Sequence, residues 1–470
     1  MKLFSLTSIL LVAAAASAQP VQLQVVKGQP TLPVQPGKPV ENTEFKPTAG
    51  STPDPKSLDV TESESMKAKE LVRQLNSASY KERETATREI GKMGRFAVPA
   101  LKDALATESS PEVRLRIELV MPKAESEDMK ARVSCFLLDT EGKFDHQLPG
   151  WTKFKGLLGN DKSTRELFAE VLKNTTYHGL LLACELPANE LGGVLIGHYQ
   201  GIQNRQNFPQ SGRVQNLQPT IGEIAVLAFL ESMYTDREMT LTNNWNYTSV
   251  ANYLYHADIQ NAMIPNRSAG KYGVVLKKIM TRWLDSRESG VGAQQAMSFA
   301  QQWQMTADIP RYAVKVLLAD AQNGQWYYKI PALTTLAQNK DAKKYLSDIA
   351  KLFEDSTTIQ PAQPGQANIH AILLGDFALG VAIKIAGQTP KDYGLEMVNT
   401  QEYAKLQQNN YYFKDEKDSK AEDKRKAGIK KFKEWIAKQP KEEPKKDEPK
   451  KDEPKPVEPK KDEPKPVIKR

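Results

Sequence analysis

The feature that most constrains this 470-residue chain is a helical hairpin that occurs twice in succession. When "KELVRQLNSASYKERETATREIG" is laid over "VPALKDALATESSPEVRLRIELV", Leu71 falls on Leu101 and Arg83 falls on Arg114, at an offset of 30 or 31 residues. Each copy predicts a helix with an L-x-x-x-L pattern, a polar turn, and a second helix that carries the arginine in its first turns. The sequence therefore predicts a tandem of helical hairpins.

Local signals mark the ends of these helices. Ser79 followed by Glu82 is typical of a capping box, and Pro111 suits the first position of the second hairpin's second helix. Gly94 suits the end of the helix between the two turns.

Residues 66–125 resemble HEAT-type repeats of the short class, with a period of roughly thirty residues. The matching features are the L-x-x-x-L helices, Arg83 and Arg114, Pro99 at the head of "PALKDAL", and "SPEVR", which matches the family's "D-x-x-V-R" phrase. The first copy has "YKERE" in that place. The resemblance implies an armadillo-type α-solenoid. HEAT-like units generally build protein-binding scaffolds, and some enzymes carry them as accessories.

Two hairpins cannot bury a continuous core alone, so their stacking partners must lie downstream. Amphipathic helical patterns recur over 150–174, 220–234, 271–286, 309–322, 329–355 and 369–394. Their predicted boundaries include capping boxes at Ser163/Glu166 and Thr220/Glu223, and a terminal Gly387. The sequence predicts an all-α, HEAT-like α-solenoid of stacked helical hairpins. Its HEAT-like repeats cover 64–125, and a helical-repeat-like region covers 126–438.

The two ends of the chain predict export and disorder. A lysine, an apolar stretch and the small-residue site "ASA" are typical of a cleaved signal peptide over residues 1–18, so we expect a periplasmic or secreted protein. The lipoprotein cysteine is absent, and no later apolar run is long enough for a transmembrane anchor. The Pro/Gln-rich linker 19–60 and the Pro/Lys/Glu-rich tail 439–470 have little to bury, so we expect both to be disordered.

Charge and cysteine usage exclude two further classes. The net charge is +8, but signs alternate along most helices, and together with export this argues against a nucleic-acid partner. Cys135 and Cys184 are the only cysteines, too few for a disulfide framework. Each lies in an apolar helical stretch. The sequence favours two buried thiols, with one disulfide between them as the alternative.

Catalytic and metal-binding patterns are absent from the sequence. The five histidines lack zinc-site spacing, and no nucleophile elbow, phosphate-binding loop or dinucleotide fingerprint occurs. Asp145 and His146 are adjacent, so their side chains should point in different directions. We therefore expect no metal, no cofactor and no enzyme.

An aromatic–amide stretch over residues 243–266 is the first candidate binding surface. Aromatic rings supply flat contact and amides supply directional hydrogen bonds, a combination that suits a peptide or a sugar. The candidate residues are Trp245, Asn246, Tyr247, Tyr253, Tyr255 and His256. The alternative is an ordinary helix in which Val250 and Leu254 face inward.

A basic amphipathic helix over residues 424–438 is the second candidate. Ile429, Phe432 and Trp435 share one face, and Lys430, Lys431 and Lys433 lie among the basic residues of the rest. Such a helix can cap the end of a solenoid with its apolar face inward, which we favour. It can also lie on an anionic membrane or polymer.

These patterns lead to three functional hypotheses. The first is an exported, non-catalytic helical-repeat scaffold that binds an unknown protein in the cell envelope or outside the cell. The alternative is a binding module for an envelope polymer, a glycan or an anionic surface. An enzyme with a site of unrecognised type is the third.

Overall fold

The computed structural model describes residues 51–174, 177–207, 218–240, 249–319, 326–360, 371–397, 411–413 and 421–439. All of them belong to one unit, Phe45–Arg470. The predicted signal peptide, most of the predicted linker and nearly all of the predicted tail lie outside the described residues. The described part is mostly helical with very little strand, so the predicted all-α class is confirmed. None of the helices described is long and apolar enough to cross a membrane.

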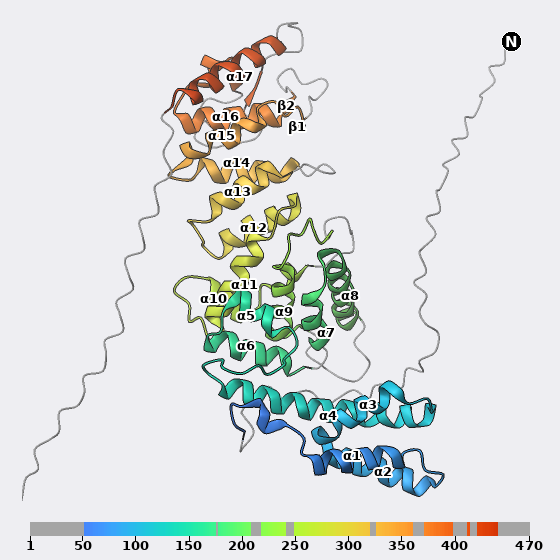
Figure 1. Cartoon of the computed structure of the whole chain (residues 1–470). Helices are drawn as coiled ribbons and strands as arrows, with labels where there is room; N and C mark the ends of the chain where they lie inside the picture. Colours follow the sequence, from blue (N-terminus) through green and yellow to red (C-terminus); the bar gives the residue numbers. More distant parts are fainter. Residues whose placement is uncertain are drawn as a thin grey trace, which may run out of the picture. The chain divides into compact units, whose positions relative to one another are not determined.

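The helices follow one another along the chain (Figure 1). The first four are α1 (Glu62–Gln74), α2 (Tyr80–Met93), α3 (Val98–Thr107) and α4 (Pro111–Leu138). The next five are α5 (Trp151–Leu158), α6 (Lys162–Leu172), α7 (His178–Leu182), α8 (Ala188–Asn207) and α9 (Ile221–Glu231). The following five are α10 (Ala257–Met263), α11 (Gly273–Asp285), α12 (Gly290–Gln302), α13 (Ile309–Leu318) and α14 (Lys329–Ala337). The last three are α15 (Leu346–Ile349), α16 (Leu374–Ala386) and α17 (Ala421–Ala437).

Within the described residues, four very short strands form two antiparallel pairs. They are β1 (Thr358–Gln360) with β2 (Ile372–Leu373), and β3 (Glu396–Met397) with β4 (Tyr411–Tyr412). Both pairs lie in the part of the chain that flanks α16, and they add little to the core.

The first two helical hairpins hold their turns in the same way. In the first hairpin, Arg83 Nη1 donates to the carbonyl oxygen of Ser77 at 2.8 Å. In the second, Arg114 Nη1 donates to the carbonyl oxygen of Glu108 at 3.2 Å. The two arginines that the sequence alignment paired thus bind equivalent carbonyls, six residues upstream in each case. This shared contact explains why each turn is followed by an arginine.

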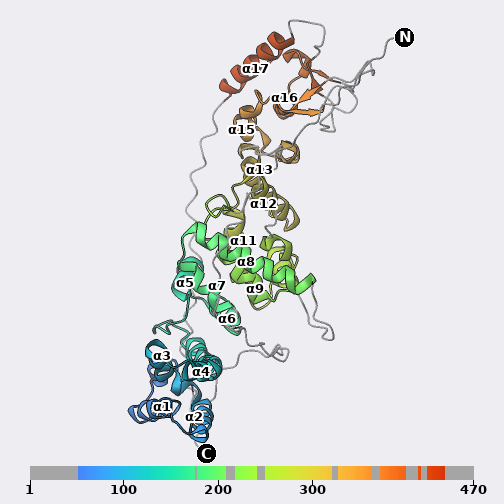
Figure 2. The same cartoon turned by 90° about the vertical axis from the view of Figure 1, so that its right-hand side faces the viewer.

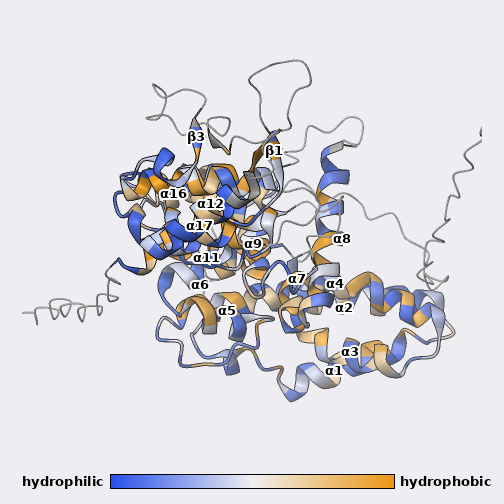
Figure 3. Cartoon of the chain, turned by 90° about the horizontal axis from the view of Figure 1, so that it is seen from above, coloured by the Kyte–Doolittle hydropathy of each residue, from blue (hydrophilic) through white to orange (hydrophobic). Residues whose placement is uncertain are grey.

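The buried apolar side chains form two clusters, and α4 contributes to both. The first cluster runs from Ala68 to Ala124, and the second runs from Val133 to Phe432. Hydrophobic and hydrophilic residues alternate along α4 (Figure 3). The boundary expected between residues 125 and 126 falls inside this continuous helix, in the stretch of α4 where the first cluster ends and the second has not yet begun.

Helix α4 continues through a proline. Pro122 lacks the N–H that would bond the carbonyl of Glu118, and a proline in a helix interior normally kinks or ends the helix. Both residues are exposed, so water can take the place of the lost bond. The helix can therefore extend as far as Leu138.

Each helix from α10 to α13 contacts the next one in the chain, and α14 packs on α16 (Figure 1). Figure 2 shows α11, α12 and α13 in this order from another side. Helix α9 packs on both α6 and α11. Residues Gly222–Glu231 of α9 are all buried, so the amphipathic pattern expected over 220–234 does not describe this helix. A helix that is covered on every side has no solvent face to keep polar.

The predicted caps are partly right. Ser79 accepts the N–H of Glu82, and Thr220 accepts the N–H of Glu223, as expected. Gly387 ends α16 with φ at +70°, a conformation that glycine adopts without strain. The start of α6 differs, because Asp161 and not Ser163 caps it by accepting a backbone N–H.

Both cysteines are free and buried, so the alternative of a disulfide does not hold in this structure. Cys135 lies on α4, and Cys184 lies in the turn that follows α7. Burial, together with the nearby charge of Glu185, raises the pKa of the Cys184 thiol to about 11. At neutral pH this thiol is protonated and behaves as a small apolar group.

Candidate functional site

The aromatic–amide stretch is only partly visible. Trp245, Asn246 and Tyr247 lie outside the described residues. Tyr253 is half-buried, whereas Tyr255 is 65% exposed. His256 caps α10, since its Nδ1 accepts the N–H of the residue two positions later. Tyr253 thus ends a short 3₁₀ turn, Tyr255 lies in the link that follows it, and His256 caps α10, so the three do not belong to one regular helix.

The helical alternative for this stretch holds in part. Val250 and Leu254 are fully buried, as that interpretation expects. They lie in or next to a short 3₁₀ turn, Val250–Tyr253, and α10 begins only at Ala257. The segment is therefore two short helical pieces with buried anchors.

Tyr253 lies near a cluster of charged groups that the sequence did not reveal. The carboxylate of Glu223 on α9 accepts a hydrogen bond from Arg205 Nη2 at 2.7 Å, and His198 Nε2 lies 2.8 Å from the same oxygen. The hydroxyl of Tyr177 donates to the other carboxylate oxygen at 3.0 Å. These contacts tie α8 and the start of α7 to α9.

The cluster shifts the ionisation of its members. Burial opposes charge on Glu223, but the hydrogen bonds from His198 and Arg205 outweigh it and hold its pKa below the ordinary value. Burial, together with the Glu223 charge, raises the pKa of Tyr177 to about 12. Each oxygen of the carboxylate contacts a side chain from another part of the chain, so Glu223 is placed to hold these helices together.

Stability should depend on pH through Glu223. Its folded pKa is lowered, so its contribution is present above the unfolded pKa, near 4.5, and is lost as pH falls through the folded value. Glu223→Gln should cost about 2 kcal/mol at pH 7, because hydrogen bonds to a charged group are lost. In melts followed by circular dichroism, the gap between wild type and variant should close below pH 4. A gap that stays constant with pH would contradict the ion cluster, and Glu190→Gln, at an exposed position of α8, is the control.

His146 pairs with Asp139 and not with its sequence neighbour Asp145. Its Nε2 lies 3.0 Å from Oδ2 of Asp139, and both side chains are buried. Burial opposes charge on Asp139, but the backbone N–H groups of Phe144 and Lys143 and the imidazole of His146 outweigh it and lower the pKa of this carboxyl. Asp145 is exposed, as expected for the next residue along the chain. The pair closes the loop that follows α4.

The basic helix α17 packs its apolar face against the rest of the unit. Phe432 is fully buried, and its ring lies 5.1 Å from that of Tyr393 and 5.9 Å from that of Phe353. Ile429 is also buried, while Trp435 is partly buried and stacks on Phe432. The apolar side of α17 is therefore directed into the protein.

Polar contacts fix α17 at three further points. Arg425 donates two hydrogen bonds to the buried carboxylate of Asp376, at 2.9 and 3.0 Å. Lys431 Nζ donates to a backbone carbonyl at 2.7 Å, and Lys433 Nζ forms an ion pair with Glu354 at 2.6 Å. Lys430 is exposed and makes no ion pair with any residue that the structure describes.

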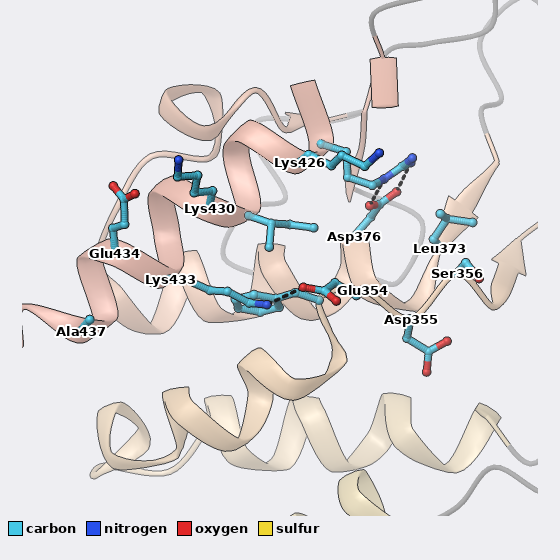
Figure 4. A pocket seen from close by; sticks show the side chains of 13 residues that line it. Glu354, Asp355, Ser356, Leu373, Asp376, Lys426, Lys430, Lys433, Glu434 and Ala437 are labelled. Carbon is cyan, nitrogen blue, oxygen red and sulfur yellow. Dashed lines mark hydrogen bonds and ion pairs between the residues drawn. The ribbon is translucent and has the colours of Figure 1, made fainter. Parts of the chain in front are cut away.

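A groove of about 740 Å³ runs along α17 (Figure 4). Its floor is apolar and consists of Phe353, Leu373 and Ile429. Charged side chains surround the floor, with the Arg425–Asp376 pair toward one end and the Lys433–Glu354 pair bridging α17 to the turn after α15 (Figure 4). The sequence indicated the α17 side of this groove but not the opposite side, which residues 353–356 together with Leu373 and Asp376 supply.

The described part of the chain contains no group of three or more His, Cys, Asp or Glu side chains arranged to hold a metal ion. Comparisons with known proteins add no assignment. The chain matches no family model, and no curated protein or solved structure matches it either.

Proposed function

We propose that this chain is an exported, non-catalytic scaffold of HEAT-like repeats that binds another protein, and that the groove along α17 is part of its binding surface. The observation that carries the proposal is the groove itself, an apolar floor of three elements that lies open between charged side chains. Partner-binding surfaces combine an apolar centre with a polar rim in this way.

Two observations support the repeat architecture. Arg83 and Arg114 bind equivalent turn carbonyls, as repeated units should. Successive helices from α10 to α14 pack on their neighbours in chain order, which is how a solenoid builds a continuous core from units that cannot fold alone.

The form of the groove supports a protein partner over a small ligand. The lining residues of α17 extend from Arg425 to Ala437, which corresponds to about 18 Å of helix. The rim residues Lys430, Lys433 and Glu434 are exposed, so an occupant would keep one side in water. Small-molecule sites usually enclose most of their ligand. A long, half-open groove suits a segment of polypeptide.

The position of α17 also favours the first hypothesis over an anionic surface. A helix that lies on a membrane must present its apolar face to the lipid. Phe432, at the centre of that face, is fully buried against Tyr393 and Phe353. Contact with lipid would therefore require α17 to leave the protein.

Site-specific photo-crosslinking tests the proposed function. A photoreactive amino acid placed at Lys430, on the groove rim, should give one discrete protein adduct in the producing cells. The same group at Lys277, an exposed position of α11, is the matched control and should give none or much less. The absence of any protein adduct at position 430 would contradict the proposal.

A further inference from the structure

We infer that the groove along α17 recognises an extended segment of a partner protein that places apolar side chains on the floor and a single carboxylate beside Lys430. This inference rests on the proposed function and adds the chemistry of the partner to it.

The floor selects for apolar side chains. Phe353 follows α15, Leu373 is in β2, and Ile429 is on α17, so three separate elements converge on one apolar surface. Phe353 and Ile429 are buried and Leu373 is half-buried, so the floor is shaped by packed residues. An extended segment presents alternate side chains to one face, which allows one face to cover this floor while the other remains in water.

The rim selects for a carboxylate. Three of the acidic side chains that line the groove already have cationic partners, since Asp376 pairs with Arg425, Glu354 with Lys433, and Asp355 with Lys329 at 3.7 Å. Lys430 has no ion partner among the described residues and projects at the exposed edge of α17 (Figure 4). A carboxylate on the partner would supply one.

A glutamate on the rim limits how many carboxylates a partner can place there. Glu434 lies one helical turn beyond Lys430 on the rim, and no residue within the described ranges pairs with it. A second carboxylate on the partner would meet this negative charge. A segment with one acidic side chain therefore fits the rim around Lys430 and Glu434.

Peptide binding to the full chain tests this chemistry. The probes are three fluorescein-labelled ten-residue peptides with alternating valines: one carries a central glutamate, the second a lysine in its place, and the third has serines for the valines. Fluorescence anisotropy should show that the glutamate peptide binds more tightly than the lysine peptide, and that the serine peptide does not bind.

A charge reversal on the rim supplies the decisive comparison. In Lys430→Glu the ratio of affinities for the glutamate and lysine peptides should invert. The ratio should change on the order of tenfold, because one attractive contact becomes repulsive. Lys438→Glu makes the same change of net charge on an exposed residue that follows α17 and lies outside the groove, so the ratio should stay as in wild type. Circular dichroism checks that both variants are folded.

Other outcomes would overturn the inference. If Lys430→Glu leaves the ratio of affinities for the glutamate and lysine peptides unchanged, recognition of a carboxylate is refuted. The scaffold function would still be supported in that case by a protein adduct at position 430. If the protein binds vesicles that contain phosphatidylglycerol more tightly than it binds the glutamate peptide, the groove is a lipid site. Tighter binding by a peptide that copies residues 459–470 would make the chain's own tail the occupant.

Discussion

Glu231→Ala should destabilise the protein by about 4 kcal/mol, because it leaves a buried arginine without its counter-ion. Glu231, at the end of α9, is completely buried, and Arg287 Nη1 donates to its carboxylate at 3.1 Å. Four more donors converge on the same carboxylate: the Tyr199 hydroxyl at 2.6 Å, Trp283 Nε1 at 2.7 Å, the Val250 N–H at 3.0 Å and the Ser249 hydroxyl at 3.2 Å. Thermal melts should show the loss as a large drop in Tm.

A double variant separates the ion pair from the other contacts. Glu231→Ala combined with Arg287→Ala removes both charges, so its destabilisation should be clearly smaller than the sum of the two single effects. Glu190→Ala, on the exposed face of α8, is the matched control and should be near neutral. A Tm for Glu231→Ala within a degree or two of wild type would show that this network does not hold α8, α9 and α11 together.

Local signals in the sequence account for much of the secondary structure. Ser79, Thr220 and Gly387 act within a few residues of their positions in the chain. Ser79 and Thr220 cap the starts of α2 and α9, and Gly387 ends α16, as expected. The start of α6 was missed because Asp161 and Ser163 are both good cap residues, and sequence alone does not choose between them. The sequence also does not show that α4 extends to Leu138, because a proline such as Pro122 normally kinks or ends a helix.

Long-range contacts explain what the sequence did not show. The partners of Glu223 lie 18, 25 and 46 residues away, and Arg287 lies 56 residues from Glu231. Periodicity describes one element at a time, so it cannot say which acidic residue on one helix meets which basic residue on another. Residues 222–231 of α9 are all buried, and a buried carboxylate is costly unless it is paired. A glutamate in such a helix therefore needs partners from other helices.

The groove illustrates the same limit. The sequence singled out Lys430 and Trp435 on an amphipathic helix, and both lie on α17. The groove also needs an opposite wall, which includes Phe353, Glu354 and Asp376. Two ion pairs join this wall to α17, and their partners lie 49 and 79 positions apart in the sequence. A helix pattern cannot reveal a wall that a distant segment supplies.

Leu101→Asp should unfold the first two hairpins and leave the larger part of the protein folded. Leu101 on α3 is fully buried in the cluster that runs from Ala68 to Ala124. The substitution removes an apolar side chain and places an unpaired carboxylate in an apolar core. It should lower the free energy of unfolding by at least about 4 kcal/mol. Because the cluster from Val133 to Phe432 is separate, its own packing is not directly affected.

Limited proteolysis with mass spectrometry distinguishes this local effect from general unfolding. Cleavage should appear within residues 62–107 of Leu101→Asp, while the region from α5 to α16 stays resistant, since unfolding in a protein with separate clusters need not be global. Ala106→Asp introduces the same charge on the exposed side of the same helix and should leave the digestion pattern unchanged. Equal resistance of the two variants would mean that the register of the second hairpin is wrong. Loss of protection along the whole chain would mean that α4 couples the two clusters into a single cooperative unit.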